Sequence, residues 1–554
     1  MNRRSFVQHL AASLAAVAGM PVTSSSPTMN SRSSATDLNS STGKKNQRGA
    51  ALASRTMHEI QELLNTGAVT SEQLTREYLR RIEATNIKGV ALRAVICTHP
   101  DALREAQTMD KERRRGNLRG PLHGVPILIK DNIDTRDMPT TAGSLLMASH
   151  QPGSDAPLVK NLREAGAIIL GKTNLSEWAN FRSTRSSSGW SSIGGQARNP
   201  HVLDRSPSGS SSGSAIAVAA SLCAAAIGTE TDGSIVSPAS SCGIVGFKPT
   251  VGLIDQLGII PISATQDTAG PIARSVRDCA VLMNILQQPV HTDPYSATSS
   301  TAASSSAASP ASRALPDHTA YLYPEALRGK RIGVDVSYKN HLPAVVELFE
   351  KNLKVLRACG AEIIECSLFS AVQKRTGSKE WDVLLYEFQR DLSAYLKSSG
   401  APVHSLQELI DANIKNADRC MPAFGQEIFI EAVRATNSQE YTAALESTLA
   451  ARGVIDDEFA AKKLDAVVCV TTGPAWCIDL INGDSPTSPS CSSPAAMSGF
   501  PHATVPMGFV RGLPVGLSVM STANTDAQVL GYAYAFEQAS TARRDPTFAA
   551  TVSL

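Results

Sequence analysis

Two serine-rich turns and one lysine carry the residue types needed to break an amide bond. Residues 208–214 read SGSSSGS, residues 231–234 read TDGS, and Lys130 ends an apolar run upstream of both. A serine hydroxyl is a weak nucleophile until a base removes its proton. Histidine is the usual base, but none of the eleven histidines lies beside these turns in the sequence. The combination predicts a serine hydrolase that works without histidine or metal.

Lys130 is the candidate base because of the residues that precede it. The apolar run 125–129 is typical of a buried strand and would carry the lysine amine into apolar surroundings. Burial disfavours the ammonium form, so the amine becomes neutral enough to accept a proton. The alternative is a solvated strand end, which is where a lone lysine is usually found. The apolar run, followed by Asp131 and Asn132, weighs against that alternative.

Ser210 and Ser234 are the candidate hydroxyl groups. They stand 24 positions apart, and the alanine-rich segment between them predicts a helix and a loop that returns. Gly233 lets the backbone pass close to a ligand. We expect the amides of Thr231, Asp232 and Gly233, together with that of Ser234, to point inward as an oxyanion hole. Such preorganised donors contribute about 3 kcal/mol to acyl transfer.

Two other interpretations of the glycine-serine turns are weaker. A flexible linker at 208–214 conflicts with the alanine-rich helix that is predicted directly after it. Linker composition occurs instead at 296–312, which is almost pure serine, alanine and threonine. A phosphate-binding P-loop would need a GK[ST] ending, which this stretch lacks.

Short buried strands alternate with helices along the chain, a pattern that indicates an α/β fold. The predicted helices begin with 52–67 and with a segment that starts at Thr70, where Gln73 completes a capping-box pattern. Further predicted helices cover 158–166, 212–226, 344–359 and most of 380–450. The predicted strands are 125–130, 167–170, 244–247, 331–334, 361–364, 464–470 and 515–520.

Composition excludes several classes of function. The chain has 554 residues, and 52 Lys and Arg against 50 Asp and Glu leave no basic surface for nucleic acid. Its ten cysteines contain no CxxC pair, so no zinc framework is predicted and buried free thiols are expected. One disulfide, between Cys477 and Cys491 across a loop, stays open as an alternative.

The amino-terminal residues predict export. Arg3 and Arg4 precede Phe6 and an apolar run at 10–18, as in a bacterial twin-arginine signal. That run is too short for a permanent membrane anchor, so none is expected. We predict a signal peptide at 1–22, a disordered leader at 23–49 and a periplasmic or secreted protein. A single domain would then cover 50–545, with a flexible insertion at about 294–316.

The motifs together resemble the amidase signature family over roughly residues 50 to 540. The resemblance rests on the stretches 124–131, 209–214, 228–235, 246–252, 266–271, 499–501 and 505–508. It implies a mixed, twisted central β-sheet covered by helices on both faces, and no cofactor. Within the family, residues 230–236 (ETDGSIV) are most similar to bacterial peptide amidase. The implied substrate is a small-molecule or peptide carboxamide, above all a C-terminal peptide amide.

The resemblance also implies roles for the three polar residues. Ser234 corresponds to the nucleophile that becomes acylated, and Ser210 to a bridging serine preceded by a cis peptide bond. Lys130 corresponds to the base that draws the proton through Ser210. Two positions depart from the usual family pattern: Val236 stands where most members have arginine, and Asp232 where most have glycine. These two departures affect the walls of the expected substrate pocket. They leave unchanged the three residues Lys130, Ser210 and Ser234, which are called the triad below.

Two alternative functions stay open from the sequence. The same core motifs occur in the glutaminase subunit of tRNA-amidating complexes, although the predicted export signal argues against a cytosolic complex. A non-catalytic exported binding protein on the same fold is the other alternative, and the presence of all three triad residues argues against it. The sequence makes no prediction of oligomeric state.

Overall fold

A mixed β-sheet runs through the residues that the computed structural model describes, which are 52–288, 315–486 and 488–553. The predicted signal peptide (1–22) and leader (23–49) lie outside the described residues, as does all but the end of the predicted insertion (294–316). These assignments, with the domain limits 50–545, stay predictions. At the carboxyl end, Phe548 and Ala549 donate backbone hydrogen bonds to Pro200 and His201, so packing continues beyond residue 545.

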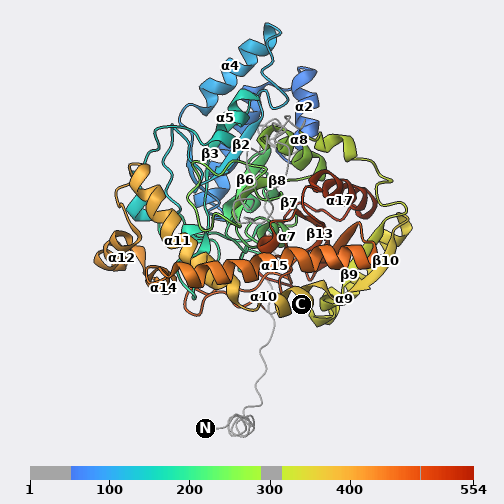
Figure 1. The fold of residues 1–554 in the computed structure, drawn as a ribbon. Helices are drawn as coiled ribbons and strands as arrows, with labels where there is room; N and C mark the ends of the chain where they lie inside the picture. The colour runs from blue at the N-terminus through green and yellow to red at the C-terminus, as the bar shows by residue number, and fades with distance from the viewer. Residues whose placement is uncertain (1–51, 289–314, 487, 554) are drawn as a thin grey trace, which may run out of the picture. The chain divides into compact units, whose positions relative to one another are not determined.

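In this described part of the chain the sheet has eleven strands in the order β1-β3-β2-β6-β8-β7-β12-β13-β11-β9-β10. Figure 1 shows strands from β3 to β10 following one another across the molecule. Its strands are β1 (Val95–Thr98), β2 (Pro126–Lys130), β3 (Ile168–Thr173), β6 (Ala225–Glu230), β7 (Val245–Lys248), β8 (Thr268–Ala273), β9 (Arg331–Asp335), β10 (Glu362–Cys366), β11 (Ala466–Val470), β12 (His502–Val510) and β13 (Leu513–Met520). A separate two-stranded ribbon joins β4 (Trp190–Ser191) to β5 (Gly195–Gln196).

Parallel and antiparallel pairing alternate in blocks. Strands β3, β2 and β6 are parallel, as are β10, β9 and β11, whereas the strands between these blocks pair antiparallel. Because β2 and β6 are parallel, their carboxyl ends lie at the same edge of the sheet. Lys130 therefore ends next to the turn that carries Ser234.

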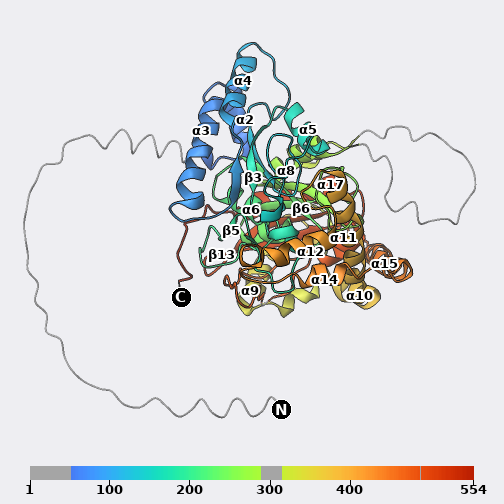
Figure 2. The ribbon, with the colours of Figure 1, turned by 90° about the vertical axis from the view of Figure 1, so that its left-hand side faces the viewer.

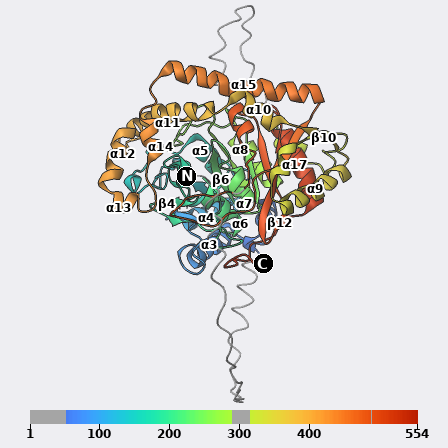
Figure 3. The ribbon, with the colours of Figure 1, turned by 90° about the horizontal axis from the view of Figure 1, so that it is seen from below.

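Helices lie on both sides of the sheet (Figure 2), and the predicted α/β fold with a mixed central sheet is confirmed. The helices are α2 (Met57–Asn65), α3 (Ser71–Ile82), α4 (Ala102–Arg114), α5 (Pro157–Glu164), α6 (Ser212–Ala219), α7 (Val236–Ser241), α8 (Val276–Leu286), α9 (Pro343–Ala358), α10 (Leu368–Thr376), α11 (Lys379–Ser398), α12 (Leu406–Lys415), α13 (Ala417–Cys420), α14 (Glu427–Ala432), α15 (Ser438–Lys462), α16 (Ser493–Ser498) and α17 (Asp526–Ser540). The long helix α15 runs beside α10 and α11 (Figure 3).

Local sequence signals mark where several helices begin. The capping box predicted at Thr70 forms, because its hydroxyl accepts the amide of Gln73 while the Gln73 side chain accepts the amide of Thr70. The same arrangement at Thr56 starts α2. Such boxes satisfy amides that the first helical turn leaves without partners.

The predicted helix 212–226 is wrong in its second half. Helix α6 ends at Ala219, and β6 begins at Ala225. The segment 220–224 between them contains no glycine or proline that would have predicted the end of the helix. Ser221 takes a positive φ of 58° directly after the helix. The guanidinium of buried Arg274 donates to the carbonyls of Val218 and Cys223 at 2.8 and 2.9 Å. A left-handed residue and a long-range contact thus coincide where the helix ends and the chain returns as β6.

No helix among the described residues is long and apolar enough to cross a bilayer. The helix that follows the first serine turn, α6, is instead buried along its whole length by the sheet. Its Gly213 lies against the backbone of two other segments, and a Cβ there would stand 2.3 Å from the Ala94 carbonyl oxygen and 2.4 Å from that of Asn174.

We predict that Gly213→Ala destabilises the protein by more than about 2 kcal/mol, because the backbone atoms it would meet cannot yield as a side chain can. Thermal unfolding measures the change. The matched control is Gly453→Ala in α15, where a Cβ meets nothing within 4 Å. That change should leave stability equal or raise it by up to about 1 kcal/mol. Equal melting temperatures for Gly213→Ala and wild type would contradict the packing argument.

Candidate active site

Lys130 lies at the carboxyl end of β2, in which every residue is buried. Its Nζ atom is 2.8 Å from Oγ of Ser210 and 2.7 Å from Oγ1 of Thr229, and it donates to the Thr229 carbonyl at 3.2 Å. The structure thus brings together two of the three residues predicted from the sequence. It adds Thr229, which the sequence analysis did not single out.

Burial lowers the pKa of Lys130 from its usual value near 10.5 to about 7. The charges of Asp267 and Glu230 oppose that shift without cancelling it. A second buried lysine shows the contrast: Lys172 pairs with Asp131 at 3.2 Å. Among the described residues Lys130 has no ion pair, so its neutral form is accessible at neutral pH.

The turn that holds Ser210 is fixed by its neighbour Ser211. The peptide bond between Gly209 and Ser210 is cis, as the resemblance implied. Ser211 Oγ accepts the Thr229 amide at 3.2 Å and donates to the Thr229 carbonyl at 3.0 Å, which ties the turn to β6. The Ser211 amide donates to the Ser234 carbonyl at 3.0 Å. This bond places the two predicted serine turns side by side.

Ser234 follows β6 in a turn that leads into α7. It retains 9% of its surface, whereas Ser210 and Lys130 retain none, so an incoming molecule reaches Ser234 first. Gly233 has a φ of +79°, and a Cβ there would lie 2.9 Å from the Ser492 hydroxyl. A side chain at this position would therefore meet both backbone strain and a clash.

The amides of this turn divide into two groups. Glu230 Oε2 accepts the amides of Ile235 and Val236, at 2.7 and 3.0 Å. The amides of residues 232–234 find no acceptor within the described parts of the chain. Unpaired donors next to a serine hydroxyl are what a developing oxyanion requires.

The two positions that depart from the family pattern have distinct surroundings. Asp232 Oδ2 accepts the Ser493 hydroxyl at 2.6 Å. Glu380 of α11 lies beside it, and burial together with the Asp232 carboxylate raises the pKa of Glu380 to about 8. Asp232 thus links its turn to α16 and α11. Val236 is buried and uses its amide, rather than a charged side chain, to bind Glu230.

A buried lysine, Lys248, interacts electrostatically with Glu230. Burial lowers the pKa of Lys248 to about 8, and Glu230 exerts the largest opposing effect. Lys248 belongs to the 246–252 motif and Glu230 to the 228–235 motif. The sequence analysis did not predict that these two side chains interact. An ionisable residue inside a family motif is the sequence signal that could have identified both residues as part of the site.

The histidine nearest in sequence takes no part in this site. His201 Nε2 lies 3.0 Å from the Cys242 carbonyl oxygen, and burial lowers the pKa of His201 to about 4. The alternative disulfide also does not form: Cys477 and Cys491 are free thiols. The Cys477 Sγ atom contacts Arg205, while that of Cys491 contacts Ser518.

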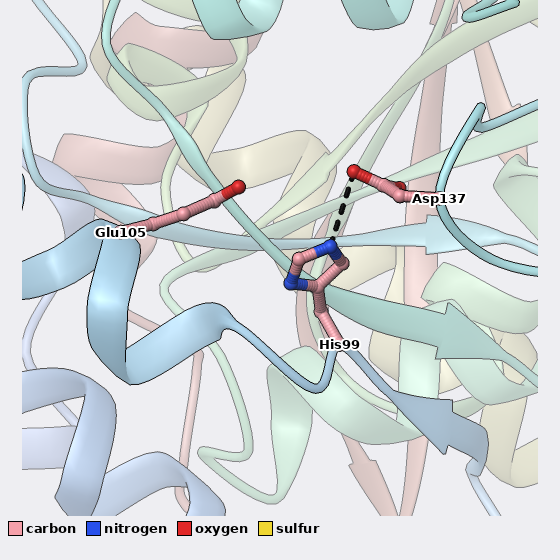
Figure 4. Close-up of side chains that lie close together, drawn as sticks. All are labelled: His99, Glu105 and Asp137. Atoms are coloured by element: carbon pink, nitrogen blue, oxygen red, sulfur yellow. Dashed lines mark ion pairs between the residues drawn. The ribbon is translucent and has the colours of Figure 1, made fainter.

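One cluster among the described residues has the ligand types of a metal site: His99, Glu105 and Asp137, shown in Figure 4. Its donors are already engaged. His99 Nδ1 accepts the Asp101 amide, which leaves the proton on Nε2 to donate to Asp137 at 3.0 Å. Arg163 pairs with both acids, at 3.4 Å to Glu105 and 2.6 Å to Asp137. The arrangement is that of an ion-pair cluster, which a metal could enter only by displacing Arg163.

Comparison with known sequences gives consistent matches. The Amidase family model matches residues 73–530. A probable amidase of Arabidopsis thaliana is 39% identical over 508 residues, covering 89% of this chain and 92% of the plant protein. A glutamyl-tRNA(Gln) amidotransferase subunit of Moorella thermoacetica is 34% identical over 503 residues, covering 87% and 96% respectively.

Solved structures extend the similarity to three dimensions. Native peptide amidase from Stenotrophomonas maltophilia matches with a TM-score of 0.81 and 46% identity, over 89% of this chain and 98% of that one. Peptide amidase PAM in complex with the competitive inhibitor chymostatin gives a TM-score of 0.83 and 46% identity, over 89% and 99%. The chain therefore belongs to the amidase signature family and is an amide hydrolase.

Proposed function

We propose that this amide hydrolase converts carboxamides, above all the C-terminal amides of peptides, to a carboxylic acid and ammonia through an acyl-enzyme. The observation that carries the proposal is the contact between the buried Lys130 amine and the Ser210 hydroxyl, 2.8 Å apart. Peptide amidase from Stenotrophomonas maltophilia, at 46% identity, supports the class of substrate.

Acylation begins with a proton transfer along the triad. The neutral Lys130 amine takes the proton of Ser210, which takes that of Ser234, and the Ser234 oxygen attacks the carboxamide carbon. The oxyanion that forms is stabilised by the unpaired amides of residues 232–234. Lys130 then returns the proton through Ser210 to the leaving nitrogen, the C–N bond breaks and ammonia departs.

Deacylation uses the same groups with water. Water loses a proton to Ser210 and Lys130 and attacks the acyl carbon, and the C–O bond to Ser234 breaks. The carboxylic acid leaves, and Ser234 regains its proton. Each cycle therefore consumes one carboxamide and one water, and it requires no oxidant or cofactor.

The similarity to the Moorella amidotransferase protein favours a second candidate, a glutaminase that acts within a complex. The two candidates differ in their need for a partner. A peptide amidase works as a purified chain, whereas a glutaminase of this kind would depend on a copurifying protein. A binding protein without activity would release no ammonia in either setting.

We predict that the purified chain releases ammonia from a dipeptide amide faster than from free glutamine, without any partner. Ser234→Ala should abolish the release, because the attacking oxygen is gone, and a fluorophosphonate should label Ser234. Ser370→Ala, at an exposed position of α10, is the control and should keep wild-type activity. Labelling of another serine would sink the assignment.

We predict that kcat/KM falls tenfold per pH unit below about pH 7, since the pKa of Lys130 is lowered to about 7 and only its neutral form accepts a proton. Lys130→Met should lower kcat/KM by at least about 100-fold. Lys172→Met is the matched control: it leaves Asp131 buried without its cation and should lower the melting temperature. A rate independent of pH between 5 and 9 would argue against Lys130 as the base.

We also propose that the protein is exported by a twin-arginine-type signal, which rests on Arg3, Arg4 and the apolar run at 10–18. We expect amidase activity in the periplasmic or secreted fraction of a bacterium that expresses the full chain. Replacing both arginines by lysine should retain the activity inside the cell. Equal distribution of the two forms would contradict export by this route.

A further inference from the structure

Asp267 is a buried carboxylate in the segment before β8 that the proposed catalytic steps do not use. Its Oδ1 accepts the Thr231 hydroxyl at 2.5 Å, and its Oδ2 accepts the amides of Ile262 and Ser263 at 2.8 and 3.0 Å. One side chain thus joins the turn of the oxyanion amides to a different loop. All its hydrogen bonds come from donors that favour the ionised form.

Asp267 is also the carboxylate that acts most strongly on Lys130. Its charge exerts the largest effect opposing the burial of the amine, followed by that of Glu230. It makes no ion pair with Lys130, so it acts across space rather than by contact. The carboxylate next to Lys130 in sequence, Asp131, is paired with Lys172 instead.

We infer that Asp267 is a positioning residue for amide hydrolysis, which holds the oxyanion turn through Thr231 and supplies the negative charge that balances the Lys130 ammonium formed during catalysis. The inference rests on the proposed role of Lys130 as the base. It adds to the site a polar residue that touches neither the substrate nor the reacting atoms.

The charges around the pair determine the direction of the effect. Lys130 faces Asp267 and Glu230, and Asp267 in turn faces Glu387 of α11. Burial raises the pKa of Asp267 to about 6, and the Glu387 charge adds to that rise. Asp267 is therefore ionised above pH 6, where it favours the ammonium of Lys130. Without it the pKa of Lys130 would fall further, and the amine would be a weaker base.

The test is the pH profile of kcat/KM for Asp267→Asn. Removing the negative charge should shift the acid limb of the profile, which is the fall of kcat/KM at low pH, to lower pH by about half a unit or more. At pH 8 kcat should fall by about tenfold or more, because the ammonium intermediate loses its counter-charge. A residue with a merely structural role would lower activity and stability and leave the acid limb in place. That result overturns the inference.

Two variants of Thr231 test the hydrogen bond separately. Thr231→Val removes the bond to Asp267 but keeps the carboxylate, so it should lower kcat with a smaller movement of the acid limb. Thr231→Ser keeps a hydroxyl and should restore most of the activity. If Asp267→Asn does not fold, the two Thr231 variants decide the question. Wild-type activity in Thr231→Val overturns the inference. Loss of activity in Thr231→Val together with near-wild-type activity in Thr231→Ser supports it.

Failure of the inference can be told apart from failure of the proposed function. If Lys130→Met keeps its activity, the proposed base is wrong and the inference falls with it. If Lys130→Met is inactive while Asp267→Asn keeps the wild-type acid limb, the base stands and the inference alone is wrong.

Discussion

The site depends on one constraint, a lysine amine that is buried without a carboxylate to pair with it. Water stabilises an ammonium strongly, so removing water favours the neutral amine. The chain contains its own comparison on the adjacent strand, where Lys172 is equally buried but paired with Asp131. Of these two lysines, only Lys130 keeps an amine without a carboxylate partner among the described residues, as the proposed role of a base requires.

The serine turns around Lys130 are held by polar groups that bind backbone amides. Ser211 ties the first turn to β6 and to Ser234, while Glu230 binds the amides that begin α7. Asp267 anchors Thr231 from outside the turn. These bonds leave the amides of residues 232–234 unpaired and fixed in place, so little reorganisation would be needed if charge developed nearby.

Much of this could be predicted from local sequence, because local physics produces it. An apolar run placed Lys130 in a buried strand, and a hydroxyl followed three residues later by glutamine started α3 at Thr70. The order of the motifs along the chain indicated the family, and the family match confirms it. The resemblance also implied the cis peptide bond before Ser210, which the structure contains.

Contacts between distant residues were beyond this reasoning. Arg274 binds carbonyls at the end of α6 from about fifty positions away, and no residue within the helix signals this contact. Strands β8 and β12 were not predicted, and each contains a proline, which is unusual in a central strand. Asp232 could not be placed either, because its partners Ser493 and Glu380 come from separate helices.

The place of β12 and β13 in the sheet has a consequence for biosynthesis. They are the last strands along the chain, yet they lie between β7 and β11 and join the two parallel blocks. A nascent chain that ends near residue 490 already contains Lys130, Ser210 and Ser234, but it lacks the strands that unite the two halves and the serine that packs on Gly233. Almost the whole polypeptide must therefore be synthesised before the sheet and the packing around Gly233 can be completed.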